Sequence, residues 1–243
     1  MRTTNPVLNA KTFANVQRVV GTPTMTLEGT INRTAFLLLI LVATATWTWM
    51  EAFIGSPIDG YLLAGLLGGF AVGLVTAFAP AIARFTAPVY AALEGLALGA
   101  ISAIYEARFH GIVMQAVALT FGVMIALLFV YRLRVIPITA KFKAGVCAAT
   151  GGIAVFYLVA IGLQAFGVHI GMLHEGSPLG IIFSLFVITI ASLNLVLDFD
   201  FIEQGIEHGA PKQMEWFAAF GLIVTLIWLY VAILRLLSKL RNR

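Results

Sequence analysis

Acidic side chains inside apolar runs are the residues of this sequence best placed to do chemistry. Glu94 lies about one turn inside the apolar run 88–105, and Asp198 ends the apolar run 179–197. A bare carboxylate in hydrocarbon costs ~3 kcal/mol or more, so each acid must be protonated, paired or facing water. Both are candidates for an ion or proton site. For Glu94, a satisfied polar residue near the membrane interface is the alternative interpretation.

Asp198 has a polar neighbour one helical turn away. The helix is expected to continue beyond Asp198 to Glu207, because the next terminators are Gly209 and Pro211. On that helix Asn194 shares a face with Asp198, and two polar residues one turn apart can share a proton or bind a cation. Asn194 therefore joins the candidate site.

Other acids near these segments are secondary candidates. Asp200, Glu203 and Glu207 fall on a different face of the same helix and are best explained as a solvated stripe. Asp200 and Glu215 are kept as secondary site residues. Because Asp198 and Asp200 point to different sides of the helix, they make a poor aspartyl protease dyad.

Glu94 and Asp198 are expected at comparable depth. If the N-terminus lies inside, the third span begins and the sixth span ends on the cytoplasmic side. The two carboxylates could then face one another. Since two such groups in a medium of low dielectric constant cannot both ionise cheaply, the pair would form a proton-sensitive gate or a cation site.

Enzymatic chemistry is not supported by the remaining polar residues. The four histidines fall in expected connectors without metal-ligand spacing: His110, His169, His174 and His208. Ser177 precedes a proline in a loop and is no nucleophile elbow. The sequence therefore predicts neither an enzyme, nor a resident cofactor, nor a metal site.

Long apolar segments must position these acids. Of the 243 residues 60% are apolar and only 11% are charged, with a mean hydropathy of +0.99, which excludes an ordinary soluble domain. Because ~20 apolar residues span a bilayer, we expect an all-α polytopic membrane protein with seven transmembrane helices. The runs are 34–54, 61–83, 88–105, 111–131, 144–166, 179–199 and 217–237.

The polar ends and the basic residues suggest the topology. We expect a polar cytoplasmic tail at 1–33, a transmembrane domain at 34–237 and a basic tail at 238–243. The net charge of +4 comes from Lys and Arg between apolar runs, which indicates topology signals and no nucleic acid partner. They favour an inside N-terminus. Seven crossings would leave the basic C-terminal tail outside, against this rule, unless the last segment re-enters without crossing.

Small residues recur every four positions in the second and third spans. The two sets are Gly65, Gly69 and Gly73 in the second span, and Ala91, Gly95, Gly99 and Ala103 in the third. Side-chain-free positions on one face let neighbouring backbones approach closely. Tight helix packing, rather than transport, is the favoured interpretation.

Several segments together resemble the Bax inhibitor family, also called transmembrane Bax-inhibitor-motif or YccA-like proteins, in its bacterial branch with a long polar N-terminal tail. The segments are Met25-Thr26-Leu27, Ala87 to Gly95, Leu193 to Asp200, and Met214-Glu215-Trp216 leading into Ala219 to Leu222. The resemblance covers nearly the whole chain. It implies six helices around a central last helix, a cell (inner) membrane location, pH-sensitive calcium leak with transient Ca²⁺, and a link to a membrane protease of the FtsH type.

By this resemblance Asp198 corresponds to one acid of a family pair whose partner lies in the last helix. That stretch here reads Leu229-Tyr230-Val231-Ala232, so the partner acid is replaced by alanine. Two functions remain open. One is a pH-sensitive calcium or proton leak channel with Asp198 as the intramembrane acid. The other is a non-transporting regulator, a monomer or weak oligomer, that binds a membrane protease or other membrane partner in the lipid bilayer.

Overall fold

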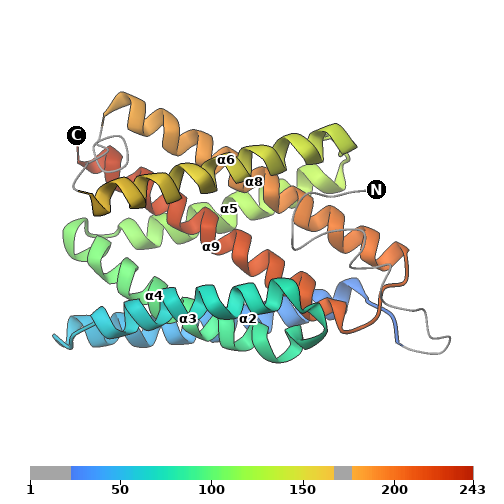
Figure 1. Cartoon of the computed structure of the whole chain (residues 1–243), viewed down its shortest axis with the longest axis horizontal. Helices are drawn as coiled ribbons and strands as arrows, with labels where there is room; N and C mark the ends of the chain where they lie inside the picture. Colours follow the sequence, from blue (N-terminus) through green and yellow to red (C-terminus); the bar gives the residue numbers. More distant parts are fainter. Residues whose placement is uncertain (1–22, 167–176, 243) are drawn as a thin grey trace. The chain divides into compact units, whose positions relative to one another are not determined.

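Apolar helices make up nearly all of the regular structure. The computed structural model describes residues 23–166 and 177–242, and within them seven helices are long and apolar enough to cross a membrane. In chain order (Figure 1) they are α2 (Leu27–Phe53), α3 (Asp59–Phe78), α4 (Ala83–Arg108), α5 (Ile112–Arg132), α6 (Ala140–Ala165), α8 (Pro178–Glu207) and α9 (Met214–Arg241), with the 3₁₀ turn η1 (Pro80–Ile82) before α4. The chain is a multi-pass membrane protein.

The first helix begins earlier than the apolar pattern indicates. We expected a polar tail through residue 33, but α2 starts at Leu27 because Thr26 caps it, accepting a hydrogen bond from the backbone N–H of Gly29. The side-chain cap starts the helix in a polar stretch that carries no hydropathy signal.

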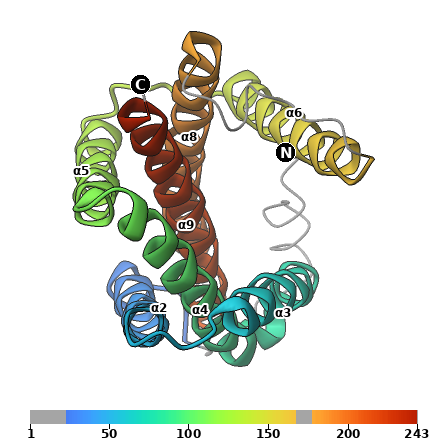
Figure 2. The same ribbon diagram turned by 90° about the vertical axis from the view of Figure 1, so that its left-hand side faces the viewer.

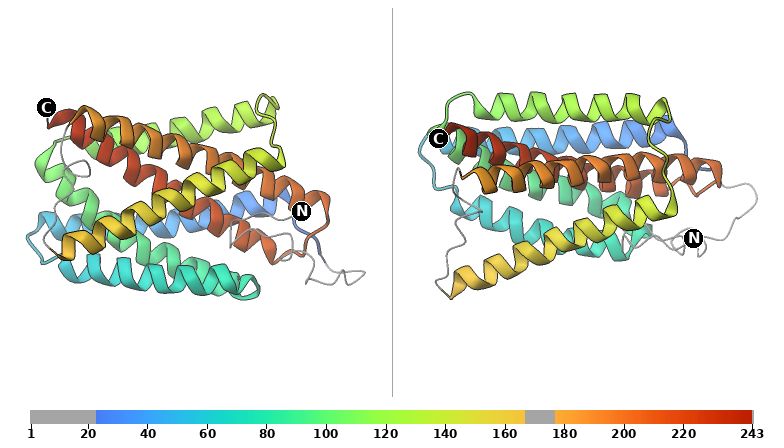
Figure 3. Two further views of the ribbon diagram at one scale, coloured as in Figure 1. Left: turned by 45° about the horizontal axis from the view of Figure 1, so that its top comes forward. Right: turned by 90° about the horizontal axis from the view of Figure 1, so that it is seen from above.

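The last helix ends later than expected. The segment 238–243 was expected as a basic tail, but α9 continues to Arg241 and Lys239 is buried. Hydrogen bonds from the basic side chains to neighbouring helices account for this difference, as described below. Figure 3 shows α9 as one unbroken helix from the α8–α9 turn onward.

The extension of the sixth span beyond Asp198 is confirmed. α8 runs unbroken to Glu207, and the chain then turns at Gly209, whose φ of 63° lies in the left-handed region that glycine adopts without strain. Asp198 thus lies within a continuous helix and not at its end. The third span also starts earlier than expected, with Pro88 inside α4.

The chain divides into two compact units. The first unit contains residues 23–108 and 198–224, and the second contains 109–166, 177–197 and 225–242. In the first unit α4 lies between α2 and α3 (Figure 2), and its buried face is rich in alanine and glycine.

Burial differs strongly among the spans. In its most apolar window α9 is 67% buried, whereas the corresponding windows of α3, α5 and α6 are each 17% buried. Large apolar side chains such as Phe70, Met114 and Leu158 are exposed on those outer spans, as expected for surfaces that face lipid tails. The high burial of α9 is what a central helix requires. The arrangement of six helices around it stays a prediction.

Candidate functional site

Asp198 is a buried carboxyl group in the first unit. Its residue is 7% exposed, and the helix that carries it continues for more than two turns beyond it. Gly221 of α9 lies beside it, because a Cβ added to this glycine would be 3.9 Å from Asp198 Oδ1. The absent side chain of Gly221 therefore leaves room for the carboxylate between α8 and α9.

Aromatic contacts connect α8, α9 and α4 in the first unit. Phe201 of α8 packs against Phe217 of α9 with ring centroids 6.2 Å apart. On the same helix Phe220 makes an edge contact with Tyr90 of α4 at 4.9 Å. Asp198 is buried in the same apolar helix as Phe201, where an ionised carboxyl group is expensive unless it is compensated.

The side-chain amide of Asn194 donates hydrogen bonds to α6 and to its own helix. Its amide group donates to Thr150 Oγ1 of α6 at 2.7 Å and to the backbone oxygen of Ile190 at 2.8 Å. The first of these bonds joins α8 to α6 in the second unit. Only the side-chain oxygen of Asn194 remains for a cation, and the proposed sharing of a proton with Asp198 stays a prediction.

Glu94 packs against α3. It is half-buried on α4, about three turns into the helix instead of one, because α4 begins before the apolar run. A Cβ added to Gly69 would lie 2.6 Å from Glu94 Oε1, so the carboxyl group occupies the space beside this glycine. The contacts above place Glu94 beside α3 and Asp198 beside α9. Their facing arrangement stays a prediction.

The small residues of both expected sets lie in helix contacts. Gly65 faces α4 so closely that a Cβ there would be 2.6 Å from the backbone nitrogen of Ala97. On the opposite face of α4, Gly95 and Gly99 lie against the backbone of α2 at Leu41 and Ala45. Glycine thus lets three helices approach at backbone distance in the first unit. Gly73 meets the ring of Tyr90.

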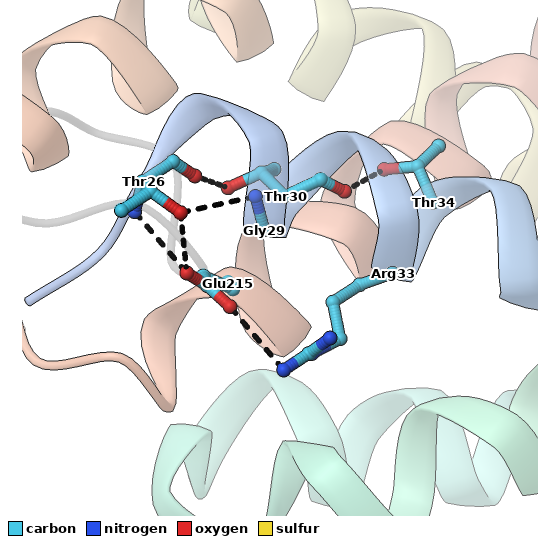
Figure 4. A network of polar contacts seen from close by, with 6 residues as sticks. All are labelled: Thr26, Gly29, Thr30, Arg33, Thr34 and Glu215. Carbon is cyan, nitrogen blue, oxygen red and sulfur yellow. Dashed lines mark hydrogen bonds and ion pairs between the residues drawn. The ribbon is translucent and has the colours of Figure 1, made fainter. Parts of the chain in front are cut away.

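Glu215 is a fully buried acid with several polar contacts, although the sequence indicated it only as a secondary candidate. Its residue is 0% exposed at the start of α9. Its Oε1 accepts hydrogen bonds from the backbone N–H of Thr26 at 3.2 Å and from Thr26 Oγ1 at 3.0 Å. Its Oε2 lies 3.4 Å from Arg33 Nη2 (Figure 4). The carboxylate therefore joins the starts of α2 and α9.

Neighbouring groups shape this contact. The guanidinium of Arg33 also lies over the Trp216 ring, 4.9 Å from its centroid. Gly29 faces the Glu215 carboxylate, and any side chain at this position would collide with it. Planar stacking and an ion pair together fix the orientation of the guanidinium.

Asp200 accepts a hydrogen bond from a side chain of its own helix. Gln204 Nε2 donates to Asp200 Oδ2 at 2.6 Å, which is a pair one turn apart on α8. Glu207 is exposed and Glu203 is half-buried, so the acidic stripe is solvated at its end only.

No cluster of metal-ligating side chains occurs in the described part of the chain. Within residues 23–166 and 177–242 no three His, Cys, Asp or Glu side chains come together in a way that could hold a metal ion. His110 and His208 lie in connectors between helices, and His169 and His174 fall outside the described residues.

Comparison with known proteins identifies the family. The sequence matches the family described as Bax inhibitor 1 like over residues 5–242. The chain belongs to this family. No curated protein matches the chain. In this Bax inhibitor 1 like protein Ala232, where the sequence resemblance led us to expect an acid, lies in an apolar cluster of the second unit together with Ile153, Val187 and Ile190. This environment suits alanine and would not suit a lone carboxylate.

Two residues of the Glu215 contact were not recognised from the sequence. Arg33 was assigned to topology and Thr26 to the segment before the first span. The available signal was the family resemblance, because Met25-Thr26-Leu27 and Met214-Glu215-Trp216 both carry it and the structure brings these two segments together. Nothing in their spacing along the chain could have predicted that contact.

Proposed function

We propose that this Bax inhibitor 1 like protein is a pH-sensitive leak for protons or calcium ions, with Asp198 as the intramembrane acid. The observation that carries the proposal is an acidic residue only 7% exposed inside an unbroken apolar helix. A buried ionisable residue in a membrane span marks an ion or proton pathway more often than a structural contact.

The proposal also states in which membrane the protein would lie and that it would not be an enzyme. The protein would lie in the cell (inner) membrane with a cytoplasmic N-terminus, which the basic residues of the internal connectors support. It would have no resident cofactor and would bind Ca²⁺ only transiently.

Protons are the first ion to test. A carboxylate binds one proton completely, whereas Ca²⁺ takes about six to eight oxygen ligands. Ala232 supplies no ligand oxygen, and its cluster is apolar. A site that depends on Asp198 therefore suits a proton better than a calcium ion.

The leak is tested in proteoliposomes. Replacing Asp198→Asn should reduce proton flux by about tenfold, which corresponds to ~1.4 kcal/mol in the barrier, because an amide cannot release a proton. Asp200→Asn is the matched control, since this acid lies on another face of α8 and bonds to Gln204. Equal flux through both variants would overturn the proposal.

A non-transporting regulator is the second candidate, and the apolar cluster at Ala232 favours it. In that case the protein would bind a membrane protease of the FtsH type or another membrane partner. Co-purification of the protease should then survive the double replacement of Glu94→Gln and Asp198→Asn. Loss of co-purification in this variant would count against a regulator that acts without its acids.

A further inference from the structure

The N-terminal segment is paired with the turn between α8 and α9. The backbone N–H of Met25 donates to the oxygen of Ala210 at 2.7 Å, and the N–H of Lys212 donates to the oxygen of Pro23 at 3.0 Å. Thr24 and Pro211 form an isolated antiparallel bridge between these bonds. Two extended pieces of chain far apart in sequence are thus joined directly before α2 and directly before α9.

The Glu215 contact lies next to this pairing. Thr26 follows the paired segment, and its N–H and hydroxyl both donate to the buried Glu215 carboxylate. Thr26 also caps α2 through Gly29. The same residue therefore ends the extended segment, begins the helix and binds the acid. We name the set Thr26, Arg33 and Glu215, with the backbone pairs at Met25 and Lys212, the N-terminal clasp. Figure 4 shows its side-chain contacts.

The charge of Glu215 makes the N-terminal clasp strong. Hydrogen bonds to an ionised acceptor are stronger than bonds between neutral groups. The guanidinium of Arg33 is only 29% exposed and is the cation beside the fully buried carboxylate, so their attraction is little screened by water. Removing one partner of such a pair leaves the other charge uncompensated.

We propose that Glu215 is a latch that holds residues 23–26 on the α8–α9 turn. It thereby positions the segment directly before α2. When the carboxylate is lost, the segment separates from the turn while the helices of the second unit keep their structure. The residues that form the latch include none of Glu94, Asn194 and Asp198, so its test does not use the flux measurement that tests the proposed leak.

Hydrogen exchange of single amides tests the latch in the full-length protein in nanodiscs. The amides of Met25 and Lys212 are suitable reporters, because each donates to a backbone oxygen and neither touches the replaced side chain. Glu215→Gln should speed exchange at both by about tenfold or more, through loss of the charge-assisted bonds. Glu28→Gln is the matched control, an exposed acid in the first turn of α2. Unchanged exchange at Met25 and Lys212 in Glu215→Gln would overturn the proposal.

A second pair of variants covers the case in which Glu215→Gln does not fold. Thr26→Val removes the hydroxyl that donates to Glu215, and Thr34→Val removes one that donates only to the backbone oxygen of Thr30. Thr26→Val should speed exchange at Met25 and Lys212, Thr26→Ser should restore the wild-type rate, and Thr34→Val should have no effect. Equal rates in Thr26→Val and Thr34→Val would overturn the latch.

Discussion

Two buried acids of this chain have opposite surroundings. Glu215 receives two hydrogen bonds and an ion pair, so its charge is compensated and its role is to hold chain segments together. Asp198 lies next to Gly221 on an apolar helix, where an ionised carboxyl group is expensive unless it is compensated. Burial alone therefore does not distinguish a structural acid from a functional one.

The position of the missing family acid gives a prediction for a single residue. Ala232→Glu would place a carboxylate among Ile153, Val187 and Ile190 and should lower the free energy of unfolding by about 3 kcal/mol. The loss should be larger at high pH, where more of the carboxylate is ionised. Thermal unfolding in detergent at two pH values measures it, with Ala232→Leu as an apolar control of larger volume. A variant as stable as wild type at both pH values would contradict the apolar cluster.

Three helices of the first unit pack through glycine. α4 presents one face to the glycines of α3, and its own glycines lie against α2. The sequence predicted this use of the two small-residue sets, because a four-residue repeat of glycine on a helix has few other physical explanations. The sequence did not predict that Glu94 would occupy the space at Gly69, because a single sequence does not show which helix faces pack against each other.

Helix contacts give a prediction at this scale. Gly65→Leu should destabilise the protein by about 3 kcal/mol or more, because the added side chain meets the backbone of α4 and cannot be accommodated by a rotamer change. Gly122→Leu on α5 is the matched control, since a Cβ there meets nothing within 4 Å. Melting temperatures in the same detergent compare the two. Equal destabilisation by both would show that α3 does not approach α4 at Gly65.

Helix ends were the least predictable elements. Apolar runs locate the spans well, because a helix in the hydrocarbon of a bilayer needs apolar side chains. They carry no information about the residues that cap the helix ends. Thr26 starts α2 in a polar stretch, and Arg235 and Lys239 continue α9 through hydrogen bonds to Tyr157 and Ser184. These interactions depend on neighbours that only the folded chain supplies.

At the scale of the whole molecule, seven helices in the described residues are long and apolar enough to cross a membrane, and seven crossings would be an odd number. The basic end of α9 seemed to oppose that count, because the positive-inside rule would keep it in the cytoplasm. Arg235, Lys239 and Arg241 instead donate to acceptors on α6, on α8 and beside α5. Basic residues engaged in this way are structural, so they need not determine orientation.

This gives a prediction about topology. If all seven helices cross, the two termini lie on opposite sides of the membrane. In inside-out vesicles, a protease should remove an N-terminal tag and spare a C-terminal tag. Spheroplasts, which expose the opposite face, should give the reverse result and serve as the control. Cleavage of both tags from the same side would mean that one span does not cross.

The central claim is that Asp198 controls a leak. The most direct test is the pH profile of proton flux in proteoliposomes with equal pH on both sides, driven by a potassium diffusion potential. A group that relays protons must bind a proton before it can release one, so wild-type proton flux should fall as pH rises and Asp198 is less often protonated. Asp198→Asn can neither bind nor release a proton, so its flux should be low at every pH and should lack this dependence. A variant that keeps the wild-type pH profile would contradict the account.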